Sequence, residues 1–227
     1  MELAVIHGRP ATTHDLIRLR EPITLTADAS VPAWVGPALR RTPWVVVRRG
    51  HVRDGMIPVG VRGLARQQRF AAVLAVAEIA DRLSPEELTE SRHVIARRRK
   101  GEAPALAALD RVAPILASRG HRWGPGGSVG FEIATGVATA TSSSDLDLIL
   151  RQDHPLRLDE AIDLHAALSE AAAPARVDVL LETPRGGVSL ADLTAFPARL
   201  LVRTPDGPRL AADPWVATAR VLTEGVS

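Results

Sequence analysis

Hydrophobic positions follow two different periods along the C-terminal half of the chain. Apolar residues recur every three or four positions at 104–118 and at 159–172, a spacing that predicts two helices. Short aliphatic runs at 145–150, 176–181 and 200–203 predict strands. Because these strands and helices alternate, we expect an α+β (α/β-like) domain in which helices cover a mixed sheet.

The N-terminal part has shorter hydrophobic runs and many turn residues. It is rich in proline and glycine, and the runs at 43–49 and 56–63 predict strands. At 64–83 the apolar positions recur at spacings of three and four, so a helix is predicted there. His14 and Asp15 are interpreted as a turn. We therefore expect a small α+β domain before the larger one.

A helix start separates the two parts. Ser84 offers a capping hydroxyl, and Glu87 stands three residues later, as in a capping box. The helix is expected to end in the basic run at 97–100, because positive charge suits the negative end of a helix dipole. We place the boundary here, with an N-terminal accessory, substrate-binding domain at 1–84 and a catalytic domain at 85–227.

The composition is that of a globular protein, with 227 residues of which 46% are hydrophobic. The absence of cysteine excludes disulfides, thiolate chemistry and cysteine-based metal sites. The N-terminal sequence MELAVIHGRP lacks the basic and apolar regions of a signal peptide. No run approaches the roughly 18 apolar residues that a membrane span needs. We expect a cytoplasmic protein without a membrane partner.

The calculated pI of 10.2 overstates how basic the chain is. The formal net charge is only +2, and the chain contains one lysine and no tyrosine or cysteine. Few groups therefore titrate between histidine and arginine, so a slight cationic excess raises the pI far. Aromatic residues make up only 3%, too few for the stacking surfaces of proteins that bind single strands. We expect no nucleic-acid partner.

Two aspartates stand one residue apart at the start of the aliphatic run SDLDLIL. In a strand, Asp145 and Asp147 share one face while the leucines point to the other. Two close carboxylates repel each other unless a cation lies between them, and oxygen ligands suit Mg²⁺. Asp178 interrupts the next aliphatic strand and supplies a third carboxylate. We predict that all three are catalytic and bind Mg²⁺, as in two-metal sites for phosphoryl or nucleotidyl displacement.

A glycine-rich loop, WGPGGSVG, precedes the aspartates. Gly127 and Gly130 let backbone N–H groups approach a polyphosphate, and Ser128 adds a hydroxyl donor. If a helix begins near Ser128, its positive end also faces the anion. We predict that these three residues bind substrate. A glycine-rich turn or an Asp-x-Asp pair alone is usually structural, whereas the two in this order are typical of the nucleotidyltransferase fold.

Other phosphate-binding and catalytic motifs do not fit the chain. It has no G-x-x-x-x-G-K-[ST] loop, and its histidines form no H-x-x-x-H pair that would indicate zinc. GGSVG differs from the G-x-S-x-G motif of hydrolases, and a hydrolase would leave both aspartates unexplained.

The run WGPGGSVGFEIATG, followed by SDLDLIL, resembles the phosphoribosyl-dephospho-CoA transferase of malonate decarboxylase, the holo-acyl-carrier-protein synthase of that system. The resemblance continues through VDVLLETPRGGVSL and LLVRTPDGP, and near the N-terminus through HDLIRL and PWVVVRR. It covers most of the chain and is strongest at 123–215. Its most specific feature is FEIATG, a segment that the nucleotidyltransferase fold does not generally contain.

The resemblance implies a reaction and its partners. In that family the donor is 2'-(5''-triphosphoribosyl)-3'-dephospho-CoA. A serine hydroxyl of the malonate decarboxylase acyl carrier subunit attacks the α-phosphorus of the donor, and pyrophosphate leaves. Asp145 and Asp147 match the family's metal-binding pair, whereas Asp178 is inferred from the fold.

A leaving pyrophosphate needs cationic partners, and arginine binds phosphate with two donors at once. We predict that Arg203 binds substrate, with Arg48, Arg49 and Arg185 as further candidates. Two alternatives stay open: a nucleotidyltransferase that uses an NTP to modify a small-molecule hydroxyl, and a non-catalytic nucleotide-binding module. Preference for dephospho-CoA derivatives over ATP separates the carrier-protein reaction from the first of these.

Overall fold

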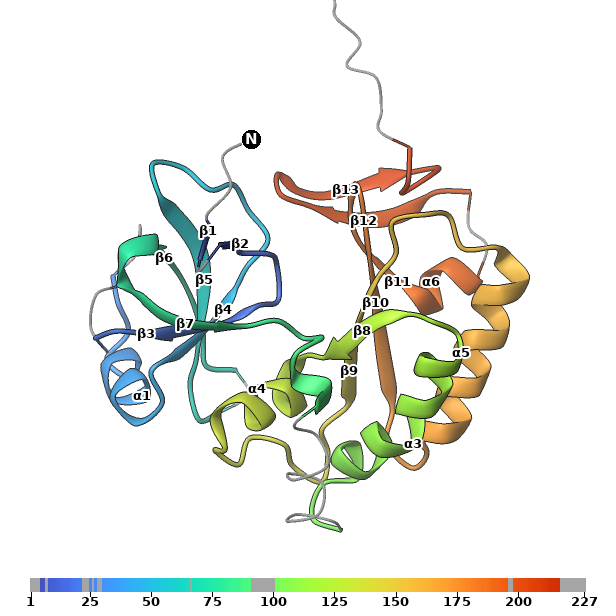
Figure 1. Ribbon diagram of the computed structural model, residues 1–227, viewed down its shortest axis with the longest axis horizontal. Helices are drawn as coiled ribbons and strands as arrows, with labels where there is room; N and C mark the ends of the chain where they lie inside the picture. The colour runs from blue at the N-terminus through green and yellow to red at the C-terminus, as the bar shows by residue number, and fades with distance from the viewer. Residues whose placement is uncertain are drawn as a thin grey trace, which may run out of the picture.

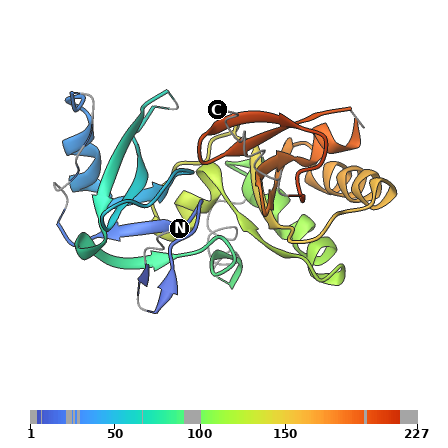
Figure 2. The same ribbon diagram turned by 90° about the horizontal axis from the view of Figure 1, so that it is seen from above.

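The chain forms two halves that lie side by side along its long axis, each built on one main sheet (Figure 1 and Figure 2). The N-terminal half has a five-stranded sheet and the C-terminal half a six-stranded sheet, so the fold is α+β, as predicted. The computed structural model describes residues 5–6, 8–21, 25, 27, 30–65, 67–90, 101–195 and 198–216. No helix among them is both long and apolar enough to cross a membrane. The cytoplasmic location stays a prediction.

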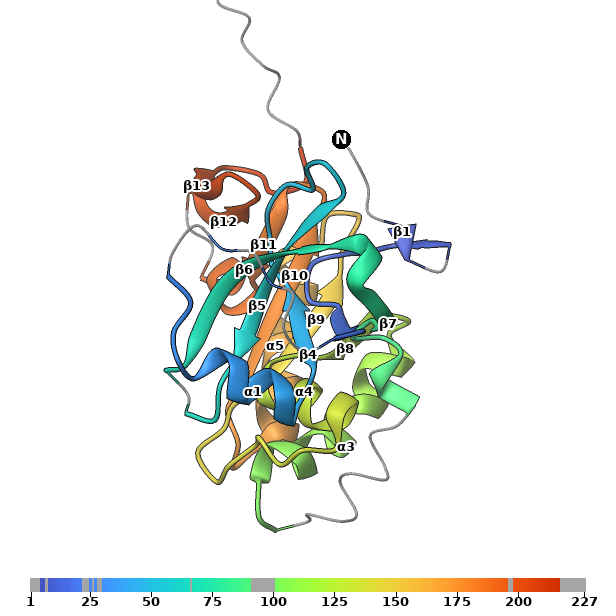
Figure 3. The same ribbon diagram turned by 90° about the vertical axis from the view of Figure 1, so that its left-hand side faces the viewer.

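Five antiparallel strands and a short helix make up the N-terminal half. Their bounds are β3 Leu16–Leu19, α1 Val35–Arg41, β4 Trp44–Val47, β5 Met56–Arg62, β6 Arg69–Ala75 and β7 Ile79–Leu83, after a small pair β1 Val5–Ile6 and β2 Arg9–Pro10. The strand order is β6-β5-β4-β3-β7. One face, with Ile57, Val59 and Val61 buried at alternate positions of β5, packs against α1. α1 lies on the side away from the C-terminal half (Figure 3), so the other face of the sheet points toward that half.

The helix predicted at 64–83 is wrong, because the structure has β6, a 3₁₀ turn and β7 there. The run is so rich in alanine, valine and leucine that its apolar positions satisfy both the helical and the strand period. Pairing with β5 decides between them, from Met56 opposite Ala75 to Arg62 opposite Arg69. Arg62 and Arg69 thereby become direct neighbours on adjacent strands.

The capping box after β7 is confirmed. The Glu87 N–H lies 3.4 Å from Ser84 Oγ, and the Ser84 N–H donates to Glu87 Oε2 at 2.7 Å. Helical residues follow at 88–90, whereas the predicted helix end at 97–100 lies outside the described residues. The division of the chain into domains at residue 84 stays a prediction.

The C-terminal half is a mixed sheet with helical cover, as predicted. Its bounds are α3 Pro104–Ser118, β8 Arg122–Pro125, α4 Gly127–Thr135, β9 Leu146–Arg151, α5 Leu158–Ala172, β10 Val177–Thr183, β11 Gly186–Ser189, α6 Leu190–Thr194, β12 Leu200–Thr204 and β13 Gly207–Ala211. In the order β13-β12-β11-β10-β9-β8, β9 and β10 are parallel and the other neighbours antiparallel. α3 and α5 pack together and bury Leu106, Leu109 and Leu164 against the sheet (Figure 1).

Candidate active site

Asp147 and Asp178 lie opposite each other on neighbouring parallel strands. They are register partners in the β9–β10 pair, so both side chains leave the sheet on the same face. Leu146 and Leu148 point the other way, into the core under α3 and α5. Asp145 immediately precedes β9, and all three aspartates line one cavity of about 430 Å³, which we call the acidic cavity. The structure thus brings together the three carboxylates that the sequence singles out.

α4 begins at Gly127, directly beside Asp147. Gly127 has a φ of +54°, where glycine is favoured, and a Cβ there would lie only 2.6 Å from Asp147 Cγ. Ser128 is buried and lines the acidic cavity together with Gly127. A helix does begin near Ser128, so the positive end of the α4 dipole faces the cavity that holds the aspartates.

Gly130 has a packing role in this structure. It is buried in the first turns of α4, and a Cβ there would press on the carbonyl group of Pro125 at the end of β8. Glycine therefore allows α4 to turn back closely after β8. The contact between Gly130 and substrate stays a prediction.

The predicted arginines occupy different places around the site. Arg203 lines a cavity of about 350 Å³ that also contains Asp147 and Asp178. Arg48 faces a cavity on the N-terminal sheet, and Arg49 forms an ion pair with a buried glutamate of β10. Arg185 is half-buried and donates to the Asp213 carbonyl at 3.0 Å, outside the cavities around the aspartates. Their substrate contacts stay predictions.

Glu132 holds the segment that leads to Asp145. This buried carboxylate of α4 accepts hydrogen bonds from the N–H groups of Thr139 and Ala140, both at 2.9 Å. The Thr139 hydroxyl in turn donates to the Ser128 carbonyl at 2.8 Å. The loop between α4 and β9 is therefore fixed to the same helix that starts at the acidic cavity.

Glu182 connects the two halves of the protein. Its carboxylate lies 2.8 Å from His14 Nε2 and forms an ion pair with Arg49, and both partners come from the N-terminal half. His14 lies in the predicted turn with a φ of +80°, and its neighbour Asp15 is buried. Burial raises the pKa of the Asp15 carboxyl, even though Thr12 and an arginine donate to it. The sequence gives no sign of these contacts between residues so distant along the chain.

Glu182 makes the stability of the protein depend on pH. Burial alone raises the pKa of its carboxyl, but the hydrogen bonds and positive charge of His14 and Arg49 outweigh burial and leave the pKa below its usual range. The ionised Glu182 carboxylate therefore makes its full contribution to the free energy of unfolding above its unfolded-state pKa of about 4.3. This contribution is lost as the pH falls through the lower folded-state pKa. We expect the difference in Tm between the wild type and Glu182→Gln to shrink as the pH falls below about 5. A difference that keeps growing below this pH would contradict the assignment.

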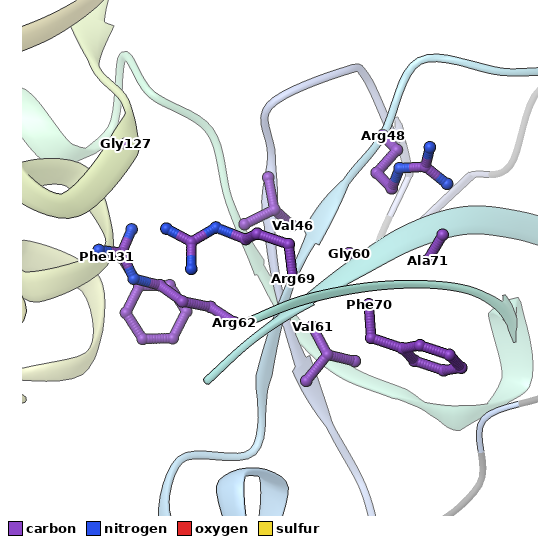
Figure 4. A pocket seen from close by; sticks show the side chains of 10 residues that line it. All are labelled: Val46, Arg48, Gly60, Val61, Arg62, Arg69, Phe70, Ala71, Gly127 and Phe131. Atoms are coloured by element: carbon purple, nitrogen blue, oxygen red, sulfur yellow. The ribbon is translucent and has the colours of Figure 1, made fainter. Parts of the chain in front are cut away.

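A second cavity lies between the N-terminal sheet and α4 (Figure 4). This cavity, which we call the sheet cavity, has a volume of about 520 Å³. Arg62 and Arg69 point from the sheet toward α4, and the Arg62 guanidinium carbon lies 5.8 Å from the centre of the Phe131 ring. Arg62, Arg69 and Gly127 line both this cavity and the acidic cavity. The sequence interpretation missed the two arginines because it placed Arg69 in a helix.

The donor atoms around the acidic cavity suit Mg²⁺. Carboxylate oxygens are hard ligands, and Mg²⁺ usually takes one or two of them and completes its shell with water and phosphate oxygens. Among the residues that the structure describes, no three His, Asp or Glu side chains are gathered closely enough to hold a metal by themselves. Asp147 together with Asp145 or Asp178 therefore fits a magnesium site whose remaining ligands come from water and substrate phosphates. The set of three carboxylate ligands stays a prediction.

Both halves of the chain match sequence models of one family. Residues 88–214 match the C-terminal domain of the phosphoribosyl-dephospho-CoA transferase MdcG, and residues 12–85 match its N-terminal domain. The chain belongs to the phosphoribosyl-dephospho-CoA transferase family. It is therefore an enzyme, a transferase for a phosphoribosyl-dephospho-CoA group, as the sequence resemblance implies.

Curated phosphoribosyl-dephospho-CoA transferases match the chain over nearly its full length. The protein from Pseudomonas putida (strain GB-1) is 41% identical over 209 residues, which are 91% of this chain and 96% of that one. The protein from Azotobacter vinelandii is 42% identical over 192 residues, 83% of this chain and 87% of the relative. No solved structure matches the chain. The family assignment therefore rests on sequence.

We expect loss of the Glu132 carboxylate to destabilise the loop between α4 and β9, which leads to Asp145. We expect Glu132→Ala to lower the free energy of unfolding by about 1–3 kcal/mol, because the half-buried Thr139 N–H and the buried Ala140 N–H lose this acceptor. Glu132→Gln keeps one acceptor oxygen and should cost less. Denaturant unfolding measures both, and hydrogen exchange at the Thr139 and Ala140 amides should accelerate in Glu132→Ala. Equal exchange in the wild type and Glu132→Ala would show that the loop is held by other contacts.

Proposed function

We propose that this transferase is a Mg²⁺-dependent nucleotidyltransferase acting on a carrier protein. It transfers 2'-(5''-phosphoribosyl)-3'-dephospho-CoA from its triphosphate donor to a serine of the malonate decarboxylase acyl carrier subunit and releases pyrophosphate. The proposal extends the family's activity to a particular donor, acceptor and metal.

One observation carries the proposal: the acidic cavity combines three aspartates with the N-terminal end of a helix. Asp145, Asp147 and Asp178 supply negative oxygen ligands on one side. Gly127 and Ser128 supply the positive end of α4 on the other side, where a polyphosphate is favoured. A cavity that has both carboxylates and an anion-binding helix end suits a metal-bound polyphosphate better than a cavity with only one of these features.

The reaction needs one bond to form and one to break. The serine oxygen of the carrier bonds to the α-phosphorus, the bond from that phosphorus to the bridging oxygen breaks, and pyrophosphate takes both electrons. Asp178 is exposed and lies beside Asp147, in a position to accept the serine proton. Arg203, in the neighbouring cavity, is placed to bind the departing pyrophosphate. Bound Mg²⁺, held by Asp145 and Asp147, would neutralise charge on the phosphates.

The intact mass of the acyl carrier subunit tests the proposal. The subunit is incubated with this enzyme, Mg²⁺ and triphosphoribosyl-dephospho-CoA, and we expect a mass gain equal to the donor minus pyrophosphate. Asp163→Asn, which changes an exposed aspartate of α5, is the matched control and should leave the gain unchanged. No gain, together with product formation from ATP and a small hydroxyl acceptor, would replace the carrier protein with a small-molecule substrate.

A further inference from the structure

A further cavity, of about 360 Å³, lies where the two halves of the protein meet. We call it the arginine cavity, because Arg48, Arg49 and Arg203 line it. Arg48 and Arg49 directly follow β4 of the N-terminal sheet, whereas Arg203 lies on β12 of the C-terminal sheet. Among the residues that the structure describes, no aspartate or glutamate lines this cavity. Its wall is therefore basic and comes from both halves.

Contacts between the two halves hold the arginine cavity in place. On one side the carboxylate of Glu182 on β10 pairs with His14 and Arg49 of the N-terminal half. On the other side is the hairpin of β12 and β13, which extends toward the N-terminal half (Figure 1). Asp206 in the turn of this hairpin lies 2.7 Å from Nε2 of His51. Both of these carboxylates are therefore already engaged by partners from the N-terminal half.

Arg48 and Arg203 are left without an acidic partner in this arrangement. In the part of the chain that the structure describes, neither guanidinium group forms an ion pair or a hydrogen bond. Because Arg49 pairs with Glu182, the three arginines bring three positive charges to the cavity against one negative charge beside it. Like charges gathered in this way repel each other, and a guanidinium group binds phosphate with two donors at once. The excess of positive charge therefore indicates a phosphate-bearing ligand.

The arginine cavity adjoins the aspartates on the side away from the acidic cavity. Arg203 and His14 line both the arginine cavity and the cavity of about 350 Å³. That second cavity contains Asp147 and Asp178, which also line the acidic cavity. The acidic cavity and the arginine cavity share no lining residue. In-line transfer requires the attacking and the leaving oxygen on opposite sides of the phosphorus, and two separate cavities that both lead to the aspartates provide two such sides.

We propose that the arginine cavity binds the diphosphate that leaves in the reaction, with Arg48 of the N-terminal half and Arg203 of the C-terminal half as its contacts. The inference rests on the proposed function, because that function supplies a triphosphate whose last two phosphates become pyrophosphate. The site is complete only when both halves are present, so the N-terminal half takes part at the reacting end of the donor. The dephospho-CoA part of the donor contains a second diphosphate, and the experiment therefore distinguishes the two.

Calorimetric titration with inorganic pyrophosphate, in the absence of Mg²⁺, tests this site apart from the reaction. We expect Arg48→Gln and Arg203→Gln each to weaken binding roughly tenfold or more, the loss of one charge-assisted contact. Dephospho-CoA is the second probe, and both variants should bind it as the wild type does. Arg209→Gln is the matched control, because it removes the same charge from the same hairpin at an exposed position that lines neither the arginine cavity nor the cavity with the aspartates. This variant should bind pyrophosphate as the wild type does.

The outcomes separate this inference from the proposed function. Wild-type affinity for pyrophosphate in Arg48→Gln or in Arg203→Gln, or no pyrophosphate binding by the wild type, would overturn the inference. An equal loss of affinity for dephospho-CoA would also overturn it, because the cavity would then hold the diphosphate of the transferred group. Failure of the wild type to modify the acyl carrier subunit would instead overturn the proposed function, whatever the titrations show.

Two further measurements show that a loss of affinity reports on the ligand. The melting temperatures of Arg48→Gln and Arg203→Gln should not fall, because neither guanidinium group has an ion pair to lose within the described part of the chain. Asp147→Asn, which removes a negative charge beside Arg203, should bind pyrophosphate at least as tightly as the wild type and yet lose transfer.

Discussion

Asp147→Asn is expected to lower the rate of transfer to the carrier by roughly a hundredfold to a thousandfold or more, the scale of electrostatic stabilisation at a reacting centre. Asp147 borders both the acidic cavity and the cavity that contains Arg203, so it lies at the centre of the site. Asparagine keeps the shape of the side chain but removes the charge that Mg²⁺ and the phosphates require. We expect the same loss from Asp145→Asn.

The fold should survive both substitutions. Asparagine has the size and shape of aspartate, and the acidic cavity is lined by two arginines, Arg62 and Arg69, as well as by the three aspartates, so removing one negative charge leaves the local charges nearly balanced. The Tm of the metal-free variants should therefore stay close to that of the wild type. The intact-mass assay and a thermal melt measure the two effects, with Asp163→Asn as control. Full activity in Asp147→Asn, or an unfolded protein, would refute the metal assignment.

Gly127→Ala is expected to produce the second large loss. Its φ of +54° costs an alanine about 1 kcal/mol, and its Cβ would overlap the Asp147 carboxylate. Either Asp147 or the start of α4 must move, and both are parts of the site. A displacement of about 1 Å at a reacting centre costs on the order of a hundredfold in rate. We expect at least that loss in the carrier-transfer assay.

Gly136 at the other end of α4 provides the control. It has a φ of +70°, and a Cβ there would meet nothing within 4 Å. Gly136→Ala should therefore show similar backbone strain and a similar decrease in Tm while transfer is retained. Equal activity in Gly127→Ala and Gly136→Ala would mean that the contact with Asp147 does not matter for the reaction.

The part of the site that the sequence predicts is the part encoded by short segments. Asp145 and Asp147 alternate with leucines over a few residues, and the start of α4 follows from a glycine-rich turn. The remaining step, Asp178 beside Asp147, requires only that two consecutive buried strands pair in parallel through a helical connection. The local sequence pattern and a common type of strand connection are therefore sufficient to predict the three aspartates and the start of α4 as one site.

The arginines of the sheet cavity depend on information that periodicity does not carry. The segment at 64–83 satisfies both the helix and the strand period, so only its pairing with β5 reveals that Arg69 faces Arg62. His14 and Glu182 are 168 positions apart and meet because the two halves pack together. Contacts that depend on tertiary pairing were therefore the ones that the sequence interpretation missed.

The contacts of Glu182 limit how members of this family can be recombined. Its carboxylate belongs to the C-terminal half, but its partners, His14 and Arg49, belong to the N-terminal half. A chimera that joins halves from two relatives keeps this cluster only if both parents carry compatible residues at all three positions. Otherwise a nearly buried charge is left without its counterpart, at a cost of several kcal/mol. When the two halves are exchanged between relatives, in nature or by design, these three residues therefore have to be kept together as a compatible set.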